Sequence, residues 1–304
     1  MKKVIISTTI NPPTEAIKRF DAMPGWELVV IGDKKTPTDY KLRRGRYVTP
    51  EEQEALFPEL SRLIGWNCIQ RRNIGFLIAH SMNADIVATV DDDNIPMPGW
   101  GENLMVGKVV SAIEWDSSLP AIDPIFCSGV HHLWHRGFPL PLVSQRMAKT
   151  SACGMGEIIA DVQADYWNGD PDIDAFCRME HAPDIHFSEE PFPFYCRKPS
   201  PFNSQNTFIS SRVLKHYFMW TKVGRYDDII GGYVAQAHGA KVVYGKASVF
   251  QKRNDHDLMR DFENEVWGMM NISGIIEDLK SPQNMFNRLP ESSTMAFRLY
   301  QSYF

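Results

Sequence analysis

Three adjacent carboxylates, Asp91, Asp92 and Asp93, follow the short apolar run Ile86–Val90. This β-branched run is typical of a strand buried on both faces. In an open α/β sheet, ligands bind beyond the carboxyl ends of the strands, so we expect the triplet to face the ligand crevice. Three like charges resist burial unless a cation lies among them, and carboxylate oxygens suit Mg²⁺ or Mn²⁺ shared with substrate phosphates. The alternative is a solvated turn, where Asp and Asn are common.

Two further groups are placed to bind a nucleotide. Asp33 follows a second apolar run and is expected to lie beside Thr8 and Thr9, where a carboxylate can accept hydrogen bonds from a ribose or a base. A plain turn residue is the alternative for Asp33. Arg71 and Arg72 lie on the helix before the acidic strand, from which an arginine can bind a diphosphate with two hydrogen bonds. A solvated basic face is the alternative, and we prefer it for Arg71.

Acidic pairs in the second half of the chain could contact a sugar or take a proton. Asp172 and Asp174 alternate with other residues in an Asp- and Pro-rich segment that either binds sugar hydroxyls or forms a turn. Asp227 and Asp228 open a predicted helix, where the helix dipole favours carboxylates; one of them could instead act as a general base. His256 follows the last predicted strand and could reach a metal or phosphate.

The elements that position these residues alternate between strand and helix. Apolar runs predict strands, in order, at Lys3–Ile10, Trp26–Ile31, Ile86–Val90, Leu119–Ile122, Ile125–Val130, Asn206–Ser210 and Lys241–Tyr244. Helical periodicity or start signals predict helices from Thr14, at Glu51–Leu63, at Asn67–His80, at Tyr226–Ala237 and from Asp257 onward. A long proline-rich loop is expected at Ala182–Pro201. Strand–helix alternation of this kind builds a parallel sheet.

Composition excludes several classes of protein. The net charge of -5 argues against a general nucleic-acid surface, although a local basic groove remains possible. Five widely spaced cysteines favour a reducing compartment over a disulfide framework. The first apolar run is too short for a signal peptide, and no later run is long enough to span a membrane. We therefore expect a soluble, cytoplasmic protein.

Several segments together resemble GT-A glycosyltransferases, and in particular the reversibly glycosylated polypeptide (UDP-arabinopyranose mutase) family and its STELLO-type relatives. The similar segments are, in order, Arg72-Asn73-Ile74-Gly75-Phe76 before Thr89-Val90-Asp91-Asp92-Asp93, Arg136-Gly137-Phe138-Pro139, Tyr166-Trp167 to Pro171-Asp172-Ile173-Asp174-Ala175, and Gly224-Arg225-Tyr226-Asp227-Asp228. The openings Ser7–Glu15 and Gly32–Pro37 are closer to the STELLO type. The similarity spans residues 3–255, and four motifs in this order are specific.

The resemblance implies a GT-A-like fold: a Rossmann-like, mostly parallel sheet flanked by helices. Residues 1–256 would form the catalytic domain, with a nucleotide-binding half at 1–100 and a sugar and acceptor half at 101–256. Residues 257–304 would form a helical extension packed on it.

It also implies a function, namely metal-dependent transfer of a sugar from a nucleotide sugar, most simply a UDP-sugar. The nucleotide would contact Thr8, Thr9, Asp33, Arg72, Asp91 and Asp92. The metal, Mn²⁺ or Mg²⁺, would bind Asp91, Asp93 and His256. Sugar and acceptor would contact Trp167, Asp172 and Asp174, with Asp227 or Asp228 as the general base.

Two departures from the mutases favour transfer to a separate acceptor. Val143 stands where the mutases carry an arginine that becomes glycosylated, and Gly245 stands where they carry a histidine. A UDP-sugar pyranose/furanose mutase and a non-catalytic nucleotide-sugar-binding subunit remain alternatives. The acceptor stays open among a glycan, a small molecule, a protein and a modified nucleic-acid base, and so does the oligomeric state.

Overall fold

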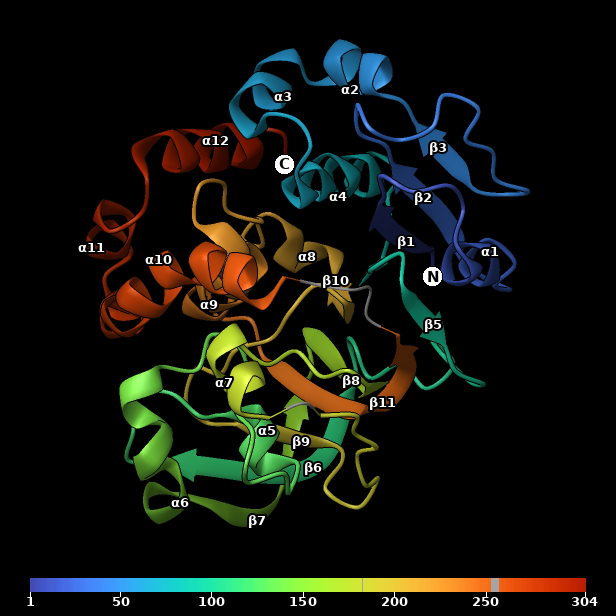
Figure 1. Cartoon of the computed structure of the whole chain (residues 1–304). Coiled ribbons are helices and arrows are strands. Elements are labelled where there is room, and N and C mark those ends of the chain that lie inside the picture. The colour runs from blue at the N-terminus through green and yellow to red at the C-terminus, as the bar shows by residue number, and fades with distance from the viewer. Residues whose placement is uncertain (182, 253–256) are drawn as a thin grey trace.

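The computed structural model describes residues 1–181, 183–252 and 257–304, and its strands form one sheet flanked by helices (Figure 1). The strands are β1 (Lys3–Thr8), β2 (Glu27–Ile31), β3 (Arg46–Val48), β4 (Ile86–Val90), β5 (Asn94–Pro96), β6 (Val109–Ser117), β7 (Thr150–Ile159), β8 (Val162–Gly169), β9 (Phe194–Cys196), β10 (Asn206–Ser210) and β11 (Val242–Gln251). The helices are α1 (Glu15–Asp21), α2 (Pro50–Leu56), α3 (Pro58–Ile64), α4 (Arg72–Ser81), α5 (Pro124–Cys127), α6 (Arg146–Lys149), α7 (Ala175–Glu180), α8 (Ser211–Leu214), α9 (Asp227–Ala237), α10 (Leu258–Glu277), α11 (Pro282–Asn287) and α12 (Glu291–Gln301). The predicted α/β class is confirmed.

The N-terminal half of the sheet is parallel, as its strand–helix alternation predicted. The order is β3-β2-β1-β4, with every pairing parallel. All five residues of β4 are buried, which confirms the strand at Ile86–Val90. Helix α4 packs closely on β1 because it carries Gly75, where an added Cβ would lie 2.4 Å from Cγ2 of Ile6. Strands end together at one edge, so the loops after β1, β2 and β4 meet there.

The other half of the sheet mixes parallel and antiparallel pairings. β10 lies between β4 and β8 and is antiparallel to both. Beyond β8 follow β11, β9, β6 and β7, while β5 pairs with β11. The long ribbon of β6 and β7 closes this end of the molecule, at the bottom of Figure 1. Because β10 pairs with both β4 and β8, it joins the two halves into one continuous sheet.

Two predicted strands are wrong. Pro124–Cys127 forms helix α5, whose N-cap Asp123 accepts a hydrogen bond from the N–H of Ile125, and Leu119–Ile122 forms no strand. Their apolar residues are buried, so hydrophobicity was recognised but periodicity could not separate a buried strand from a short buried helix. Thr14 is confirmed as the N-cap of α1.

The C-terminal helix α12 packs against residues 214–220, which run from the end of α8 toward α9, and against α3. Trp220 contacts Phe297 of α12 with ring centroids 4.9 Å apart, and the hydroxyl of Tyr300 donates to the carbonyl of Leu214. Helices from Asp257 onward are confirmed, whereas the division into domains stays a prediction. Among the described residues, no helix combines the length and apolarity needed to cross a membrane.

Candidate functional site

The acidic triplet lies directly beyond the buried strand β4, and its three side chains have different surroundings. The Asp92 carboxylate turns back to the loop after β1, where Oδ2 accepts from Thr9 Oγ1 at 2.5 Å and from Asn11 Nδ2 at 3.1 Å. The Thr14 hydroxyl donates to the Asp92 carbonyl. Asp92 therefore fixes the β1–α1 loop against the end of β4.

Asp91 forms an ion pair with a buried arginine, Arg72. Arg72 is 1% exposed, and its Nη2 donates to Asp91 Oδ1 at 2.7 Å and to Thr8 Oγ1 at 3.0 Å. Its Nη1 donates to the carbonyl and hydroxyl of Ser204, each at 2.9 Å. Burial raises the pKa of Asp91, and the charge of Arg72 opposes that rise. This geometry makes Arg72 a positioning residue for Asp91.

The interpretation of Arg71 as part of a solvated basic face is wrong. Its side chain is fully buried and donates to Gln53 Oε1 and to the carbonyls of Ser61 and Gly65. Its guanidinium also lies 3.7 Å from the ring centroid of Trp66. Burial lowers the pKa of Arg71 to about 10.

The predicted nucleotide-binding residues line one cavity of about 370 Å³. Its lining includes Thr8, Thr9, Asn11, Asp33, Asn67, Cys68, Arg72, Asp91, Asp92 and Asp93. Asp33 is also structural, because its carboxylate accepts from the N–H groups of Asn67 at 2.8 Å and Cys68 at 3.1 Å. It thereby shapes the loop that enters α4. The sequence placed Thr8 and Thr9, Asp33 and the acidic triplet at the ends of three strands, and the structure brings them together with Arg72 of α4.

A second cavity, of about 330 Å³, adjoins the first. Both are lined by Cys68, Ile69 and Asp91, and the second is also lined by Gln70, Arg136, Ser204, Gln205, Gly224, Arg225, Asp227, Asp228 and Asn264. Asp227 is 4% exposed, and its Oδ2 accepts from Gln70 Nε2 at 2.9 Å. Burial, reinforced by the adjacent Asp228, raises the pKa of Asp227 to about 7. A carboxyl with this pKa can take up or release a proton near neutrality.

Asp228 differs from its neighbour because its oxygens are already bonded. Oδ2 accepts from the N–H and hydroxyl of Ser204 at 2.9 and 3.1 Å, and Oδ1 accepts from Arg136 Nη1 at 3.2 Å. The same arginine binds Asp172 with two hydrogen bonds, of 2.7 and 2.9 Å. Asp228 thus anchors the start of α9 under the cavity.

Three predicted sugar-binding residues lie behind the cavity wall. Trp167, Asp172 and Asp174 are at most 3% exposed and line neither cavity. Burial alone would raise the pKa of Asp172, but Arg136 and His135 hold that pKa well below its usual range. Asp174 caps α7 and accepts from Trp134 Nε1 at 2.7 Å, and its burial raises its pKa to about 6. Asp172 thus positions Arg136, which lines the second cavity, and Asp174 fixes the start of α7. Direct contact of these residues with a sugar stays a prediction.

Sequence reasoning assigned no site role to Gln70, Arg136, Ser204 or Asn264, which all line the second cavity. Arg136 stood inside a recognised motif, but nothing in the sequence says that it pairs with two distant carboxylates. Asn264 comes from α10, which the sequence had placed in an extension outside the site.

The carboxylates of the first cavity fit a divalent cation in the chemistry of their donor atoms. Among the described residues, no group of three or more His, Cys, Asp or Glu side chains is arranged to hold a metal alone. Mg²⁺ is usually bound by one or two carboxylates, and substrate phosphates and water complete its coordination shell. Asp91 and Asp93 could supply these two carboxylates. His256 lies outside the described residues.

Comparison with known proteins gives two similar curated sequences, while no family model matches. The probable glycosyltransferase STELLO2 of Arabidopsis thaliana is 24% identical over 256 residues, which cover 77% of this chain and 33% of that protein. The chain is similar to STELLO glycosyltransferases. STELLO1 of the same plant is 25% identical over the same lengths. The predicted resemblance to STELLO-type glycosyltransferases is therefore confirmed, whereas the link to the mutases stays a prediction. The chain spans about a third of the length of these STELLO proteins.

Solved structures show only distant similarity. Glucosyl-3-phosphoglycerate synthase from Mycobacterium tuberculosis, in complex with phosphoglyceric acid, gives a TM-score of 0.41 at 12% identity, over 96% of this chain and 81% of that one. GalNAc-T7 with UDP, GalNAc and Mn²⁺ gives 0.38 at 10% identity, over 99% and 54%.

Proposed function

We propose that the chain is a GT-A-like glycosyltransferase that uses a nucleotide sugar, most simply a UDP-sugar, together with Mn²⁺ or Mg²⁺. The observation that carries the proposal is that two polar cavities meet at Asp91, with the acidic triplet lining one and a carboxyl of raised pKa lining the other. Two adjoining sites with a proton acceptor in one of them suit the transfer of a group from a donor to a hydroxyl.

The first cavity is the proposed nucleotide site. Thr8, Thr9 and Asp33 would contact the nucleoside, and its size suits a nucleotide. Arg72 acts on the diphosphate indirectly, by holding Asp91, since its Nη groups already donate to protein atoms. Asp92 keeps the loop after β1 in place.

The proposed metal would be held by Asp91 and Asp93, with His256 as a third candidate ligand. When bound, the metal would supply positive charge that stabilises the departing nucleotide diphosphate.

The second cavity is the proposed site of the transferred sugar and the acceptor. Gln70, Gln205 and Asn264 supply neutral hydrogen-bonding groups, and we assign Asp227 as the general base that takes the proton of the acceptor hydroxyl. Asp228 is better suited to positioning α9, because Arg136 and Ser204 occupy its oxygens. The acceptor class, a cytoplasmic location and the oligomeric state remain predictions.

Thermal unfolding with UDP, Mn²⁺ and both together tests the donor site. A ligand at about a hundred times its Kd adds roughly 2.7 kcal/mol of stability, so a clear rise in Tm is expected with both. Asp93→Asn should lose the rise, whereas Asp116→Asn, a partly exposed carboxylate on β6, should keep it. No rise with any nucleotide would contradict the proposal.

Product analysis then separates the alternative activities. Incubation with a panel of UDP-sugars and Mn²⁺ should release UDP, and release should rise when the true acceptor is supplied. Conversion of a UDP-pyranose to a UDP-furanose without acceptor would indicate a mutase. Nucleotide-dependent stabilisation without turnover under any condition would indicate a binding subunit.

A further inference from the structure

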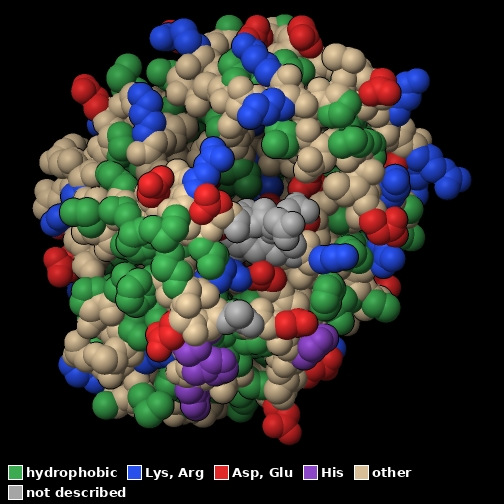
Figure 2. Space-filling view, in the orientation of Figure 1, with side chains coloured by type: hydrophobic (Ala, Val, Ile, Leu, Met, Phe, Trp, Pro, Cys, Tyr) green, Lys and Arg blue, Asp and Glu red, His purple; other side chains and the backbone are tan. Residues whose placement is uncertain are grey.

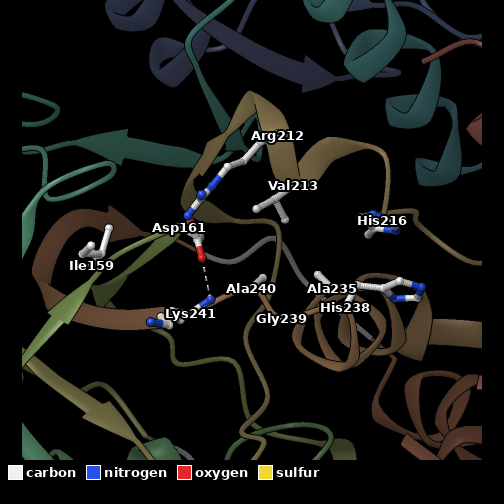
Figure 3. A pocket seen from close by; sticks show the side chains of 10 residues that line it. All are labelled: Ile159, Asp161, Arg212, Val213, His216, Ala235, His238, Gly239, Ala240 and Lys241. Carbon is white, nitrogen blue, oxygen red and sulfur yellow. Dashed lines mark hydrogen bonds and ion pairs between the residues drawn. The ribbon is translucent and has the colours of Figure 1, made fainter. Parts of the chain in front are cut away.

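A third cavity, larger than either part of the proposed active site, lies at the other ends of the elements that build that site. It measures about 470 Å³ and shares no lining residue with the first two cavities. Its lining comprises Ile159, Asp161, Arg212, Val213, His216, Ala235, His238, Gly239, Ala240 and Lys241 (Figure 3). The proposed function gives this cavity no role.

The ionisable groups of the cavity are mostly basic. Its lining includes four basic side chains, Arg212, Lys241, His216 and His238, and one carboxylate, Asp161. Figure 3 shows Arg212, Asp161 and Lys241 on one side and the two histidines on the other. The imidazole rings are stacked, with centroids 4.2 Å apart and planes 15° apart.

Asp161 does not neutralise the whole cluster. One of its oxygens pairs with the Arg212 guanidinium and the other accepts from the backbone N–H of Lys241 at 3.0 Å. The Lys241 ammonium has no ion-pair partner among the described residues. The Arg212 side chain is 65% exposed, so N–H groups not used by Asp161 remain open to a ligand.

The basic side chains have an ordinary structural explanation, which is that they cap the C-terminus of α9. Backbone N–H groups already cap this helix end. The N–H groups of His238 and Ala240 bond the carbonyl of Ala235, and the N–H of Gly239 bonds that of Gln236. Gly239 has a φ of +92°, as expected for a residue that closes a helix in this way. Among the side chains that the structure describes, His238 Nδ1 contacts the Val234 carbonyl, and neither Lys241 nor Arg212 donates to a carbonyl of α9.

We propose that this cavity binds a small phosphorylated ligand, with Arg212 and Lys241 as the principal phosphate-binding residues. Arginine offers paired donors that match phosphate oxygens, and lysine adds a point charge. The volume exceeds that of a phosphate group alone and falls in the range of small-molecule sites, so a phosphate monoester of a small molecule fits better than free phosphate.

Two elements connect this cavity with the proposed active site. β10 runs from Asn206, next to Gln205 of the second cavity, to Ser210, two residues before Arg212. α9 begins at Asp227 and ends beside His238. Strand and helix rise place the two sites roughly 15 Å apart. The proposed ligand would therefore sit outside the substrate site, whatever reaction occurs there.

The test is a titration with inorganic phosphate and, separately, with glucose 6-phosphate, without metal or nucleotide. Binding is followed by calorimetry and by NMR of the histidine ring signals, assigned with His216→Gln and His238→Gln. We expect the His216 and His238 signals to move, those of buried His135 to stay, and the ester to bind more tightly than phosphate. Tighter binding of phosphate than of the ester would replace the monoester with free phosphate as the ligand.

Lys241→Gln is the decisive variant, because Asp161 bonds the backbone N–H and carbonyl of residue 241 and the substitution leaves both in place. Loss of one charged hydrogen bond should weaken binding about tenfold. Arg212→Gln tests the second residue, with circular dichroism as the check on folding. Lys198→Gln, an exposed lysine outside the cavity, should leave affinity unchanged. If neither probe moves the His216 and His238 signals, or if Lys241→Gln binds like the parent protein, the proposal is wrong.

Discussion

Two neighbouring carboxylates with the same chemistry have different surroundings in this protein. Asp228 accepts hydrogen bonds from Arg136 and Ser204, whereas Asp227 accepts one from the neutral amide of Gln70. Burial without a strongly bound cation raises the pKa of Asp227 to about 7. Position in the sequence does not separate the two residues, but their hydrogen bonds do.

Asp227→Asn should abolish most turnover. Removal of a general base costs about 10²–10⁴ in rate, and UDP affinity should be unchanged because the residue lines only the second cavity. In the parent protein, kcat should rise as the pH passes through about 7, because only the ionised carboxylate accepts a proton. A rate that stays flat from pH 6 to pH 8 with Asp227 intact would contradict this assignment.

The same substitution should stabilise the protein at high pH. Since the folded-state pKa of Asp227 is raised, the folded protein binds more protons than the unfolded chain between about pH 4 and pH 7. Stability is therefore lost as the pH rises through this window. Asp227→Asn should raise Tm more at pH 8 than at pH 4, as thermal unfolding at both values can show. An equal change at both would mean that the carboxyl is not perturbed.

At the scale of elements, α10 forms part of the second cavity because it packs closely on the turn before α9. An added Cβ at Gly224 would lie 1.8 Å from the carbonyl oxygen of Asn264, and its φ is +62°. Gly224→Ala should therefore push α10 away and destabilise the protein by about 1–3 kcal/mol. We expect UDP binding to persist and sugar transfer to fall.

Gly107→Ala is the matched control for that prediction. Gly107 has a φ of +78° but no atom within 4 Å of the added Cβ, so it tests backbone strain without overlap. Its transfer rate should match that of the parent protein. Equal loss of transfer in both variants would assign the effect to strain rather than to the position of α10.

Arg136 joins the segment before α7 to the start of α9, because it pairs with both Asp172 and Asp228. Arg136→Met would leave two buried carboxylates without their cation, which should cost about 3–5 kcal/mol in urea unfolding. Arg197→Met removes ion pairs with Glu114 and Asp116 whose arginine is 56% exposed, and it should cost far less because solvent screens them. Similar losses in the two variants would show that the buried network is not what stabilises this region.

The elements nearest the site were also the ones that the sequence predicts best. Strands at Ile86–Val90 and Asn206–Ser210 match, because each is a short apolar run between clear breaks. The β6–β7 ribbon was missed, since β7 is largely exposed and carries two glycines, so it lacks the apolar alternation of a strand. Arg136 and Asn264 could not be assigned to the site, because their contacts depend on tertiary packing between segments far apart in the chain.

At the scale of the molecule, neither sign of charge dominates the face shown in Figure 2. Acidic and basic side chains are interspersed over the face shown in Figure 2, in keeping with a net charge of -5. Specificity would then come from the cavities rather than from a field of one sign. The cavities in turn depend on a sheet whose two halves are joined by β10.

The position of β10 has a consequence for synthesis on the ribosome. The Thr89 hydroxyl of β4 bonds the Ser204 carbonyl, 115 residues later, just before β10 covers the free edge of β4. At a synthesis rate of roughly 5–20 residues per second, the edge of β4 stays unpaired for on the order of ten seconds before β10 is made. Nascent chains that end before residue 200 should recruit chaperones or aggregate, and chains that extend past β11 should resist protease. Protection of the shorter chains would show that the first half folds without waiting for β10.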